Sequence, residues 1–179
     1  MITIPWEFAF LGWLQGMRSA VLDAVMVFFS SIGNYGLIWI AVSACFLISK
    51  KHRRRGVLLL SALAITTLAG EFVLKNIVCR NRPFVTEPAF ILLIPEPSGF
   101  SFPSVHTAAA FCAVTVLWKW RRKAGAAALI PALLIAFSRM YLYVHFPTDV
   151  LGGIVLGVVC ALVTNWLFIT RKNELTLKR

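Results

Sequence analysis

The chain has 179 residues, of which 59% are hydrophobic, and its mean hydropathy is +0.81. Soluble domains contain about 45–50% apolar residues, so this composition excludes an ordinary soluble domain and predicts a protein surrounded by lipid. The net charge of +11 would suit nucleic-acid binding, but 13 of the 18 Lys and Arg residues form three clusters beside long apolar runs. This distribution is typical of the cytoplasmic loops of membrane proteins and argues against a nucleic-acid partner. The basic clusters are Lys50, Lys51, Arg53, Arg54 and Arg55; Lys119, Arg121, Arg122 and Lys123; and Arg171, Lys172, Lys178 and Arg179.

The first 31 residues mix apolar side chains with Trp6, Trp13 and scattered charges. Residues 19–31 form a short apolar stretch that contains Asp23, and a stretch of about 10–14 residues is more typical of an interfacial or re-entrant helix than of a membrane span. Tryptophan favours the headgroup level of a bilayer. We therefore expect residues 1–31 to form a helical collar at the outer face. The alternative is a sixth span with a cytoplasmic N-terminus.

Five apolar runs follow, and each approaches the length of about 20 residues that a helix needs to cross a bilayer. The third is the shortest of them, and a single polar residue, Asn34, interrupts the first. The runs cover residues 32–49, 57–78, 105–118, 124–143 and 150–170.

The basic clusters give these runs an orientation, because cytoplasmic loops are enriched in Lys and Arg. With all three clusters in the cytoplasm, residues 75–104 and 143–149 lie together on the outer face, and the C-terminus is cytoplasmic. We therefore predict an all-α fold, a polytopic membrane bundle of five transmembrane helices plus an N-terminal interfacial segment. The chain is expected to be a single domain over residues 1–179, with the interfacial segment at 1–31, the bundle at 32–170 and a cytoplasmic tail at 171–179.

Basic residues and histidines also collect at the outer ends of the predicted spans, where the orientation rule does not call for them. Ionisable groups at membrane depth are costly and indicate a functional site, here one that holds a multiply charged anion. Glu71, four residues before Lys75, is expected to pair with it. Arg80 is expected either to contact a substrate headgroup or to extend to lipid headgroups. The residues in question are Lys75, Arg80, Arg82, Arg139, His106 and His145.

Three short stretches contain most of these residues. In the first, Lys75 is followed seven residues later by Arg82-Pro83; the second is Pro103-Ser104-Val105-His106; and the third runs from Ser138-Arg139 through His145 to Asp149. The three stretches resemble the signatures KxxxxxxRP, PSGH and SRxxxxxHxxxD of the type 2 phosphatidic acid phosphatase and vanadium haloperoxidase superfamily. They occur in the family's order, and the resemblance covers roughly residues 32–170.

The resemblance implies three catalytic residues. His145 matches the nucleophile, whose neutral imidazole attacks phosphorus and forms a phosphohistidine. His106 matches the general acid that protonates the leaving oxygen. Asp149 matches the carboxylate that accepts a hydrogen bond from the second ring nitrogen of His145 and fixes its tautomer. Pro147 suits the first turn of the last span, which places His145 just before that helix.

The phosphate-binding residues implied by the match have chemistry that suits the task. Arg82 and Arg139 supply bidentate forks and Lys75 a point charge, and Pro83 disfavours helix at Arg82, so the chain should unwind and let Lys75 and Arg82 converge. Ser104 can cap the helix of His106, bind phosphate, or do both. Val105 replaces the signature's glycine; it keeps the backbone amide but favours negative φ far more than glycine does.

The sequence thus predicts a metal-independent lipid-phosphate phosphatase without a cofactor, because Lys and Arg neutralise charge and the nucleophile is a side chain. Similarity to small bacterial family members implies a bacterial inner membrane and undecaprenyl pyrophosphate as the leading substrate, followed by phosphatidylglycerol phosphate and phosphatidic acid. Its partners are expected to be this lipid phosphate and the surrounding membrane lipids. The alternatives are a lipid phosphotransferase and a non-catalytic protein that binds or translocates lipids.

Overall fold

The computed structural model describes residues 4–88 and 90–177, and the side chains of that part as far as residue 170. Within this part the regular elements are all helical, so the predicted all-α fold is confirmed. The C-terminal basic cluster, from Arg171 to Arg179, lies outside the described side chains. The elements are α1 (Pro5–Gly16), α2 (Ala20–Gly33), η1 (Asn34–Gly36), α3 (Leu37–Ile48), α4 (Arg53–Thr67), η2 (Leu68–Leu74), α5 (Lys75–Val78), α6 (Pro83–Thr86), α7 (Val105–Trp120), α8 (Arg122–Tyr141) and α9 (Pro147–Leu177).

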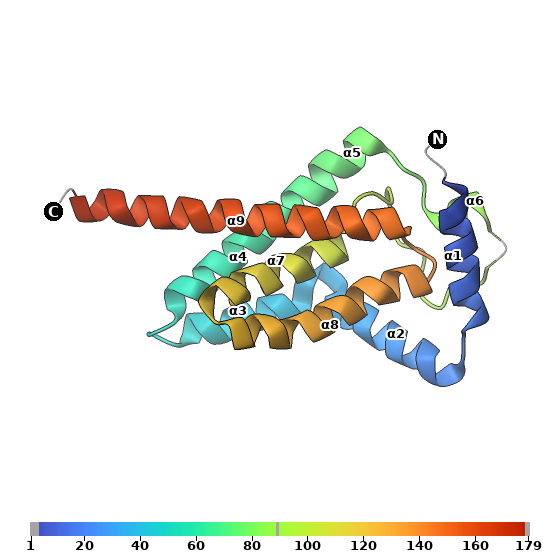
Figure 1. Ribbon diagram of the computed structural model, residues 1–179, viewed down its shortest axis with the longest axis horizontal. Coiled ribbons are helices and arrows are strands. Elements are labelled where there is room, and N and C mark those ends of the chain that lie inside the picture. Colours follow the sequence, from blue (N-terminus) through green and yellow to red (C-terminus); the bar gives the residue numbers. More distant parts are fainter. Residues whose placement is uncertain (1–3, 89, 178–179) are drawn as a thin grey trace.

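Four helical segments of the described chain are long and apolar enough to cross a membrane. The remaining predicted span, α7, has 16 residues and lies at the centre of the bundle, where Ala108, Ala110, Cys112 and Ala113 are fully buried. Its neighbours α4, α8 and α9 surround it (Figure 1). The chain is therefore a multi-pass membrane protein, and its number of spans stays a prediction. The four segments are Ala20–Ile48, Arg53–Thr86, Arg122–Tyr141 and Pro147–Thr170.

The first long segment begins earlier than the sequence suggested. Residues 20–31, which we assigned to the interfacial collar, form the first turns of a segment that runs through α2, η1 and α3. It bends at η1, where Tyr35 and Gly36 have positive φ values of 52° and 70°. Asp23, the charge that argued against a span, accepts a hydrogen bond of 2.6 Å from the Tyr141 hydroxyl. A carboxylate with a partner costs less to place in such a segment.

Helix α1 lies crosswise over one end of the bundle (Figure 1). Its Leu11 and Leu14 are fully buried and pack with Tyr143 and Phe146 of the α8–α9 connection. The orientation agrees with the predicted collar, although the collar itself is shorter than expected because α2 belongs to the following segment. The same packing brings α1 against the loop that carries His145.

Close packing of α9 on α7 depends on two glycines. A Cβ on Gly157 would lie 2.2 Å from the carbonyl oxygen of Ala108, and a Cβ on Gly153 would lie 2.5 Å from that of Ser104. Small residues four apart let helices in a membrane protein approach until their backbones touch. The start of α9, which carries Asp149, is thereby fixed against the start of α7, which carries His106.

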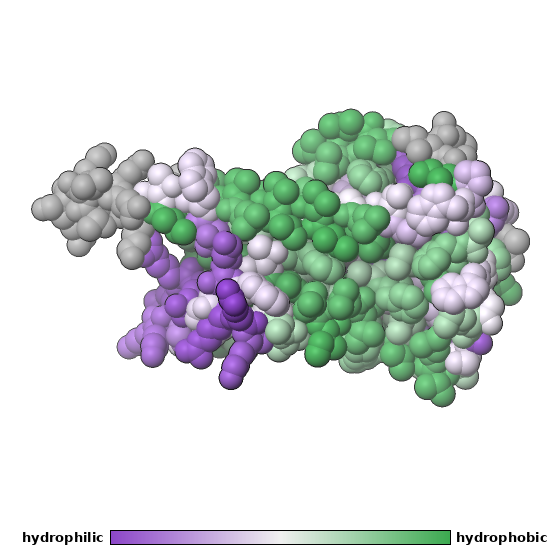
Figure 2. Space-filling model, in the orientation of Figure 1, coloured by the Kyte–Doolittle hydropathy of each residue, from purple (hydrophilic) through white to green (hydrophobic). Residues whose placement is uncertain are grey.

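The polar surface gathers at the other end of the bundle, around the α3–α4 and α7–α8 turns (Figure 2). These turns carry the first two basic clusters and lie side by side, since the Arg55 guanidinium sits 5.0 Å from the centre of the Trp120 ring. Between the two ends, α9 exposes large apolar side chains such as Val155, Val159 and Trp166. A band of exposed apolar side chains beside a basic end is the surface expected of a protein in a bilayer.

Candidate active site

The residues singled out by the three signatures gather at the end of the bundle opposite the two basic turns. They come from the start of α5, the loop before α6, the start of α7, the last turn of α8, the α8–α9 connection and the first turn of α9. Most are buried, which requires partners for their charges. The buried ones are Lys75, Arg82, Ser104, Arg139, His145 and Asp149, whereas Val105 and His106 are partly exposed.

The first stretch leaves the helical path between Lys75 and Arg82, as predicted. Helix α5 ends at Val78, the following Cys79 has a φ of +49°, and Arg82 is extended at φ −78° and ψ 157° directly before Pro83. The expected pair of Glu71 and Lys75 is also present, with Nζ 2.7 Å from Oε2. The signature spacing thus presents the two cations from separate backbone segments.

Arg82 lies against the predicted nucleophile. Its Nη1 donates to the carbonyl oxygen of Val144 over 3.0 Å and lies 3.3 Å from Nε2 of His145. Its Nε and Nη2 donate to the carbonyl oxygens of Gly99 and Ser98, over 3.0 Å and 3.2 Å. The guanidinium therefore ties the loop before α7 to the loop that carries His145.

His145 has one ring nitrogen toward a cation and the other toward an anion. Nε2 faces Arg82, whereas Nδ1 lies 3.5 Å from Oδ2 of Asp149. The predicted hydrogen bond to Asp149 is not formed at this distance, and Nδ1 has no hydrogen-bond partner among the described residues. The carboxylate instead accepts from the backbone amide of Phe146 over 2.8 Å and from the hydroxyl of Ser101.

The environment of His145 keeps its imidazole neutral. Burial lowers the pKa of His145 to about 3; Asp149 opposes this shift, and the charges of Arg82 and Arg139 add to it. The ring is therefore uncharged at pH 7, with one N–H and one nitrogen that carries a lone pair. A neutral imidazole is the form that attacks an electrophile.

His106 contacts a residue that we had noted only as an interruption of an apolar run. Its Nε2 lies 2.9 Å from Oδ1 of Asn34, at the bend between α2 and α3. The preceding residue, Gly33, also lies close, since a Cβ there would be 3.3 Å from Cδ2 of His106. The bend in the first long segment thus positions the predicted general acid, and a lone polar residue in an apolar run was the signal in the sequence.

Ser104 and Val105 stand at the start of α7. Ser104 occupies the N-cap position, but its hydroxyl makes no capping bond and accepts instead from Thr107 over 3.0 Å. Of the alternatives for Ser104, the side-chain cap is not formed, and phosphate binding stays a prediction. Val105 is the first residue of α7 and is not among the residues with positive φ, so its backbone needs no glycine. Its side chain fills the space beside Gly70, where a Cβ would lie 2.9 Å from Cγ2 of Val105.

The two remaining arginines are buried in different ways. Arg139, in the last turn of α8, donates from Nη1 to the hydroxyl of Ser30 in α2. Arg80 does not extend to lipid headgroups, and that expectation is wrong, because the side chain is buried and paired with Glu7 and Asp149. Neither carboxylate follows Arg80 closely in the sequence, which is why the signatures did not reveal these pairs.

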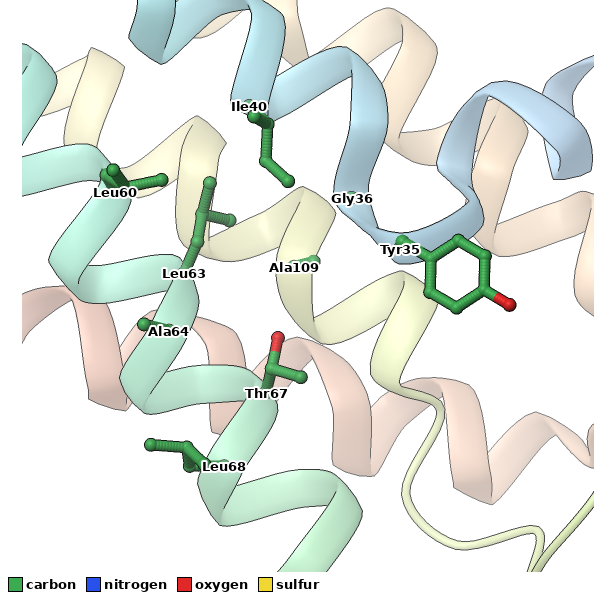
Figure 3. Close-up of a pocket in the computed structure, with 9 residues that line it drawn as sticks. All are labelled: Tyr35, Gly36, Ile40, Leu60, Leu63, Ala64, Thr67, Leu68 and Ala109. Atoms are coloured by element: carbon green, nitrogen blue, oxygen red, sulfur yellow. The ribbon is translucent and has the colours of Figure 1, made fainter.

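An apolar groove of about 360 Å³ opens close to the site (Figure 3). Its walls come from η1, α3, α4, η2 and α7, and Tyr35 at one end directly follows the Asn34 that contacts His106. Ala109 on its floor is three residues, or just under one helical turn, after His106. Leu60, Leu63 and Leu68 supply much of its apolar surface.

The sequence of the chain also matches a known protein family. Residues 55–173 match the family described as the PAP2 superfamily. The chain belongs to the PAP2 superfamily. This confirms the resemblance drawn from the three signatures, all of which fall within the matched region.

Several PAP2 relatives act on lipid phosphates according to their names. The chain is 38% identical to an undecaprenyl-diphosphatase of Sulfolobus acidocaldarius over 77% of this chain and 66% of that protein. It is 33% identical to the undecaprenyl-diphosphatase BcrC of Bacillus subtilis over 79% of this chain and 72% of that protein. A decaprenylphosphoryl-5-phosphoribose phosphatase of Mycolicibacterium smegmatis is also 33% identical, over 69% and 67% of the two chains.

Two solved structures share the fold of this PAP2 protein. One is a transmembrane PAP2-type phosphatidylglycerolphosphate phosphatase from Bacillus subtilis, with a TM-score of 0.76, 28% identity, and coverage of 91% of this chain and 84% of that one. The other is LpxE from Aquifex aeolicus, with a TM-score of 0.78, 28% identity, and coverage of 89% and 94%. Both likenesses extend over nearly the whole chain.

Proposed function

We propose that this PAP2 protein is a membrane hydrolase that removes phosphate from a lipid phosphomonoester or pyrophosphate through a phosphohistidine on His145. The observation that carries the proposal is the setting of this histidine. It is buried and neutral, its Nε2 lies 3.3 Å from Nη1 of Arg82, and its Nδ1 lies 3.5 Å from Asp149. A nucleophile needs a lone pair on an unprotonated nitrogen, a cation to draw the phosphoryl group toward it, and an anion to stabilise the charge it acquires.

The reaction follows from these positions in two balanced steps. Nε2 of His145 bonds to phosphorus while the bond from phosphorus to the leaving oxygen breaks, and His106 protonates that oxygen. Water then attacks the phosphohistidine, gives its proton to His106, and releases inorganic phosphate and free His145. Lys75, Arg82, Arg139, the hydroxyl of Ser104 and the amide of Val105 hold the phosphoryl oxygens.

We assign undecaprenyl pyrophosphate as the leading substrate, followed by phosphatidylglycerol phosphate and phosphatidic acid. Two relatives are named as undecaprenyl-diphosphatases, and one structural neighbour is a phosphatidylglycerolphosphate phosphatase. The active site faces the outside of the plasma (inner) membrane, with the basic turns and the C-terminus in the cytoplasm. The lipid tail occupies the apolar groove between α3 and α4, which opens to the membrane beside the helix of His106.

The test is phosphate release by the purified protein from a panel of lipid phosphates and pyrophosphates with EDTA present. We expect metal-independent release, fastest with undecaprenyl pyrophosphate. Transfer of labelled phosphate to an added alcohol in place of water would identify a phosphotransferase instead. If folded protein releases no phosphate and transfers none, the catalytic proposal is rejected in favour of a lipid-binding protein.

Filling the groove should lower activity according to the length of the lipid tail. Ala64 lines the groove and is exposed in it, so Ala64→Phe places a ring where the proposal puts the tail. We expect kcat/KM for a long-chain lipid phosphate to fall about tenfold, because a mismatch in an apolar site costs about 1–3 kcal/mol. A short-chain, water-soluble phosphate ester should be hydrolysed as by wild type.

The matched control for Ala64→Phe is Ala127→Phe, which adds the same ring to an exposed position of α8. It should change neither rate. Equal losses for long and short substrates in Ala64→Phe would mean that the ring disturbs the site and that the groove does not hold the tail.

A further inference from the structure

Helix α1 contributes a buried acid to the site. Glu7 lies in the first turn of α1 and its side chain is completely buried. Its Oε1 accepts from the backbone amide of Thr148 over 3.0 Å and from the Thr148 hydroxyl over 2.7 Å, while its Oε2 accepts from Nη2 of Arg80. A buried carboxylate is expensive to hold unless its oxygens have such partners. Both oxygens of Glu7 are occupied, so it can act on the reaction only through Arg80 and Thr148.

Arg80 joins this acid to the predicted catalytic carboxylate. Its Nη1 donates to Oδ1 of Asp149 over 2.7 Å and to the hydroxyl of Thr148 over 2.6 Å, while Nη2 donates to Glu7. Its guanidinium also lies over the ring of Phe146, 4.1 Å from the ring centre. Phe146 immediately follows His145, and its ring is packed edge-on by Phe8 of α1. The arginine is therefore held from several sides and bridges two carboxylates.

The charges of Glu7, Arg80 and Asp149 explain why the site needs two carboxylates. His145 is neutral at rest and becomes positively charged when it forms the bond to phosphorus, so an adjacent negative charge favours the reaction. When both carboxylates are ionised, the charges of Asp149 and Arg80 alone sum to zero. Glu7 brings the sum to minus one. The second acid thus keeps the group of Glu7, Arg80 and Asp149, on the Nδ1 side of His145, net negative even though a cation touches Asp149.

We propose that Glu7 is a positioning residue for the phosphohistidine reaction, which offsets the charge of Arg80 so that Asp149 remains effective beside His145. Arg80 in turn fixes the Asp149 carboxylate by the bond to its Oδ1. The N-terminal helix is then part of the catalytic apparatus as well as an interfacial collar. This inference rests on the proposed function, because it assumes that His145 acquires charge in the reaction.

The experiment measures formation of phosphohistidine in a single turnover, quenched in alkali, for wild type, Glu7→Gln and Glu7→Asp. We expect Glu7→Gln to slow this step about tenfold or more, since one pKa unit of altered interaction corresponds to a factor of ten. KM should change by less than about twofold, because Glu7 is bonded to protein groups and not to phosphate. Glu7→Asp keeps the charge and should recover much of the rate.

A double variant separates the charge of Glu7 from its structural role. Glu7→Gln with Arg80→Gln removes one negative and one positive charge, which restores the net charge of minus one. We expect it to react faster than Glu7→Gln alone, whereas a purely structural role predicts a rate as low or lower, since more bonds are lost. The control is Glu96→Gln, which neutralises an exposed carboxylate of the loop before α7 and should leave the rate unchanged.

The outcomes are distinct. A Glu7→Gln protein that reacts within twofold of wild type overturns the inference, as does a double variant that is no faster than Glu7→Gln. If Glu7→Gln does not fold, the comparison passes to Glu7→Asp and the double variant, and a loss of more than about 100-fold in either overturns it. Absence of phosphohistidine from wild type would instead reject the proposed function itself.

Discussion

Phosphate release is expected to disappear when His145 is replaced by alanine, with a loss of about 10³-fold or more in kcat. The ring supplies the atom that bonds to phosphorus, and no other histidine side chain is in contact with both Arg82 and Asp149 in the described part of the chain. Release of phosphate from a lipid pyrophosphate, together with alkali-stable labelling of the protein by substrate phosphate, measures the effect. Both signals should vanish together.

The controls for His145→Ala must account for burial. The side chain is only 2% exposed, and removing a buried ring leaves a cavity that destabilises the fold. His145→Asn retains more of the volume and should be equally inactive, with a thermal midpoint nearer that of wild type. His52→Ala removes a histidine at the opposite, basic end, next to Phe46 and Trp120, and should stay active. Turnover at the wild-type rate in folded His145→Ala would remove the nucleophile assignment.

The features that the sequence predicted well are those set by local chemistry. Apolar length and basic flanks gave the helical bundle, and the proline after Arg82 correctly indicated that the helix of Lys75 ends before it. The pair of Glu71 and Lys75 followed from their spacing of one helical turn. Pro147 likewise marked the first residue of α9. Each of these depends on residues close together in the chain.

The features that were missed depend on contacts between distant segments. Glu7 and Arg80 are 73 residues apart, and Asn34 and His106 are 72 apart. No periodicity or signature relates such positions, because their pairing is decided by how α1 and η1 pack on the rest of the bundle. A physical clue existed in both cases, since a polar residue inside an apolar stretch needs a partner. A polar residue in an apolar stretch indicates that a partner exists, but only the fold identifies that partner.

The extent of the collar shows how a tertiary contact overrides local preference, whereas the missing Ser104 cap reflects a contact within its own helix. Serine before a helix ordinarily caps it, but the Ser104 hydroxyl accepts from Thr107, three residues later in the same helix, while its amide donates to the carbonyl oxygen of Asp149 over 3.0 Å. Asp23 within an apolar stretch predicted an interfacial segment. In the structure its carboxylate accepts a hydrogen bond from the Tyr141 hydroxyl of α8, so the charge has a partner. The prediction for residues 20–31 was therefore sound for an isolated helix and was changed by a bond from a neighbouring helix.

Replacing Asp149 with asparagine should reduce kcat by about 10³- to 10⁴-fold, the scale of the same change in a serine protease triad. Two causes combine. The change removes the negative charge beside His145, and it puts an amide NH₂ where one carboxylate oxygen now accepts hydrogen bonds. That NH₂ must face either Arg80 or the donors Ser101 and Phe146, all of which also donate. The activity and the free energy of unfolding should therefore fall together, the free energy by about 1–3 kcal/mol.

Comparison of the loss of activity with the loss of stability in Asp149→Asn distinguishes a catalytic role of Asp149 from a structural one. The control is Asp23→Asn, which changes a carboxylate of α2 that accepts a hydrogen bond from the Tyr141 hydroxyl. It should leave kcat nearly unchanged. If Asp149→Asn is less stable but forms phosphohistidine at the wild-type rate, the carboxylate only fastens α9 to Arg80 and Ser101. If it loses activity at a temperature where it is fully folded, the charge beside His145 is what the reaction needs. The 3.5 Å separation of Nδ1 and Oδ2 then marks a resting geometry, which must shorten to a hydrogen bond as His145 acquires charge.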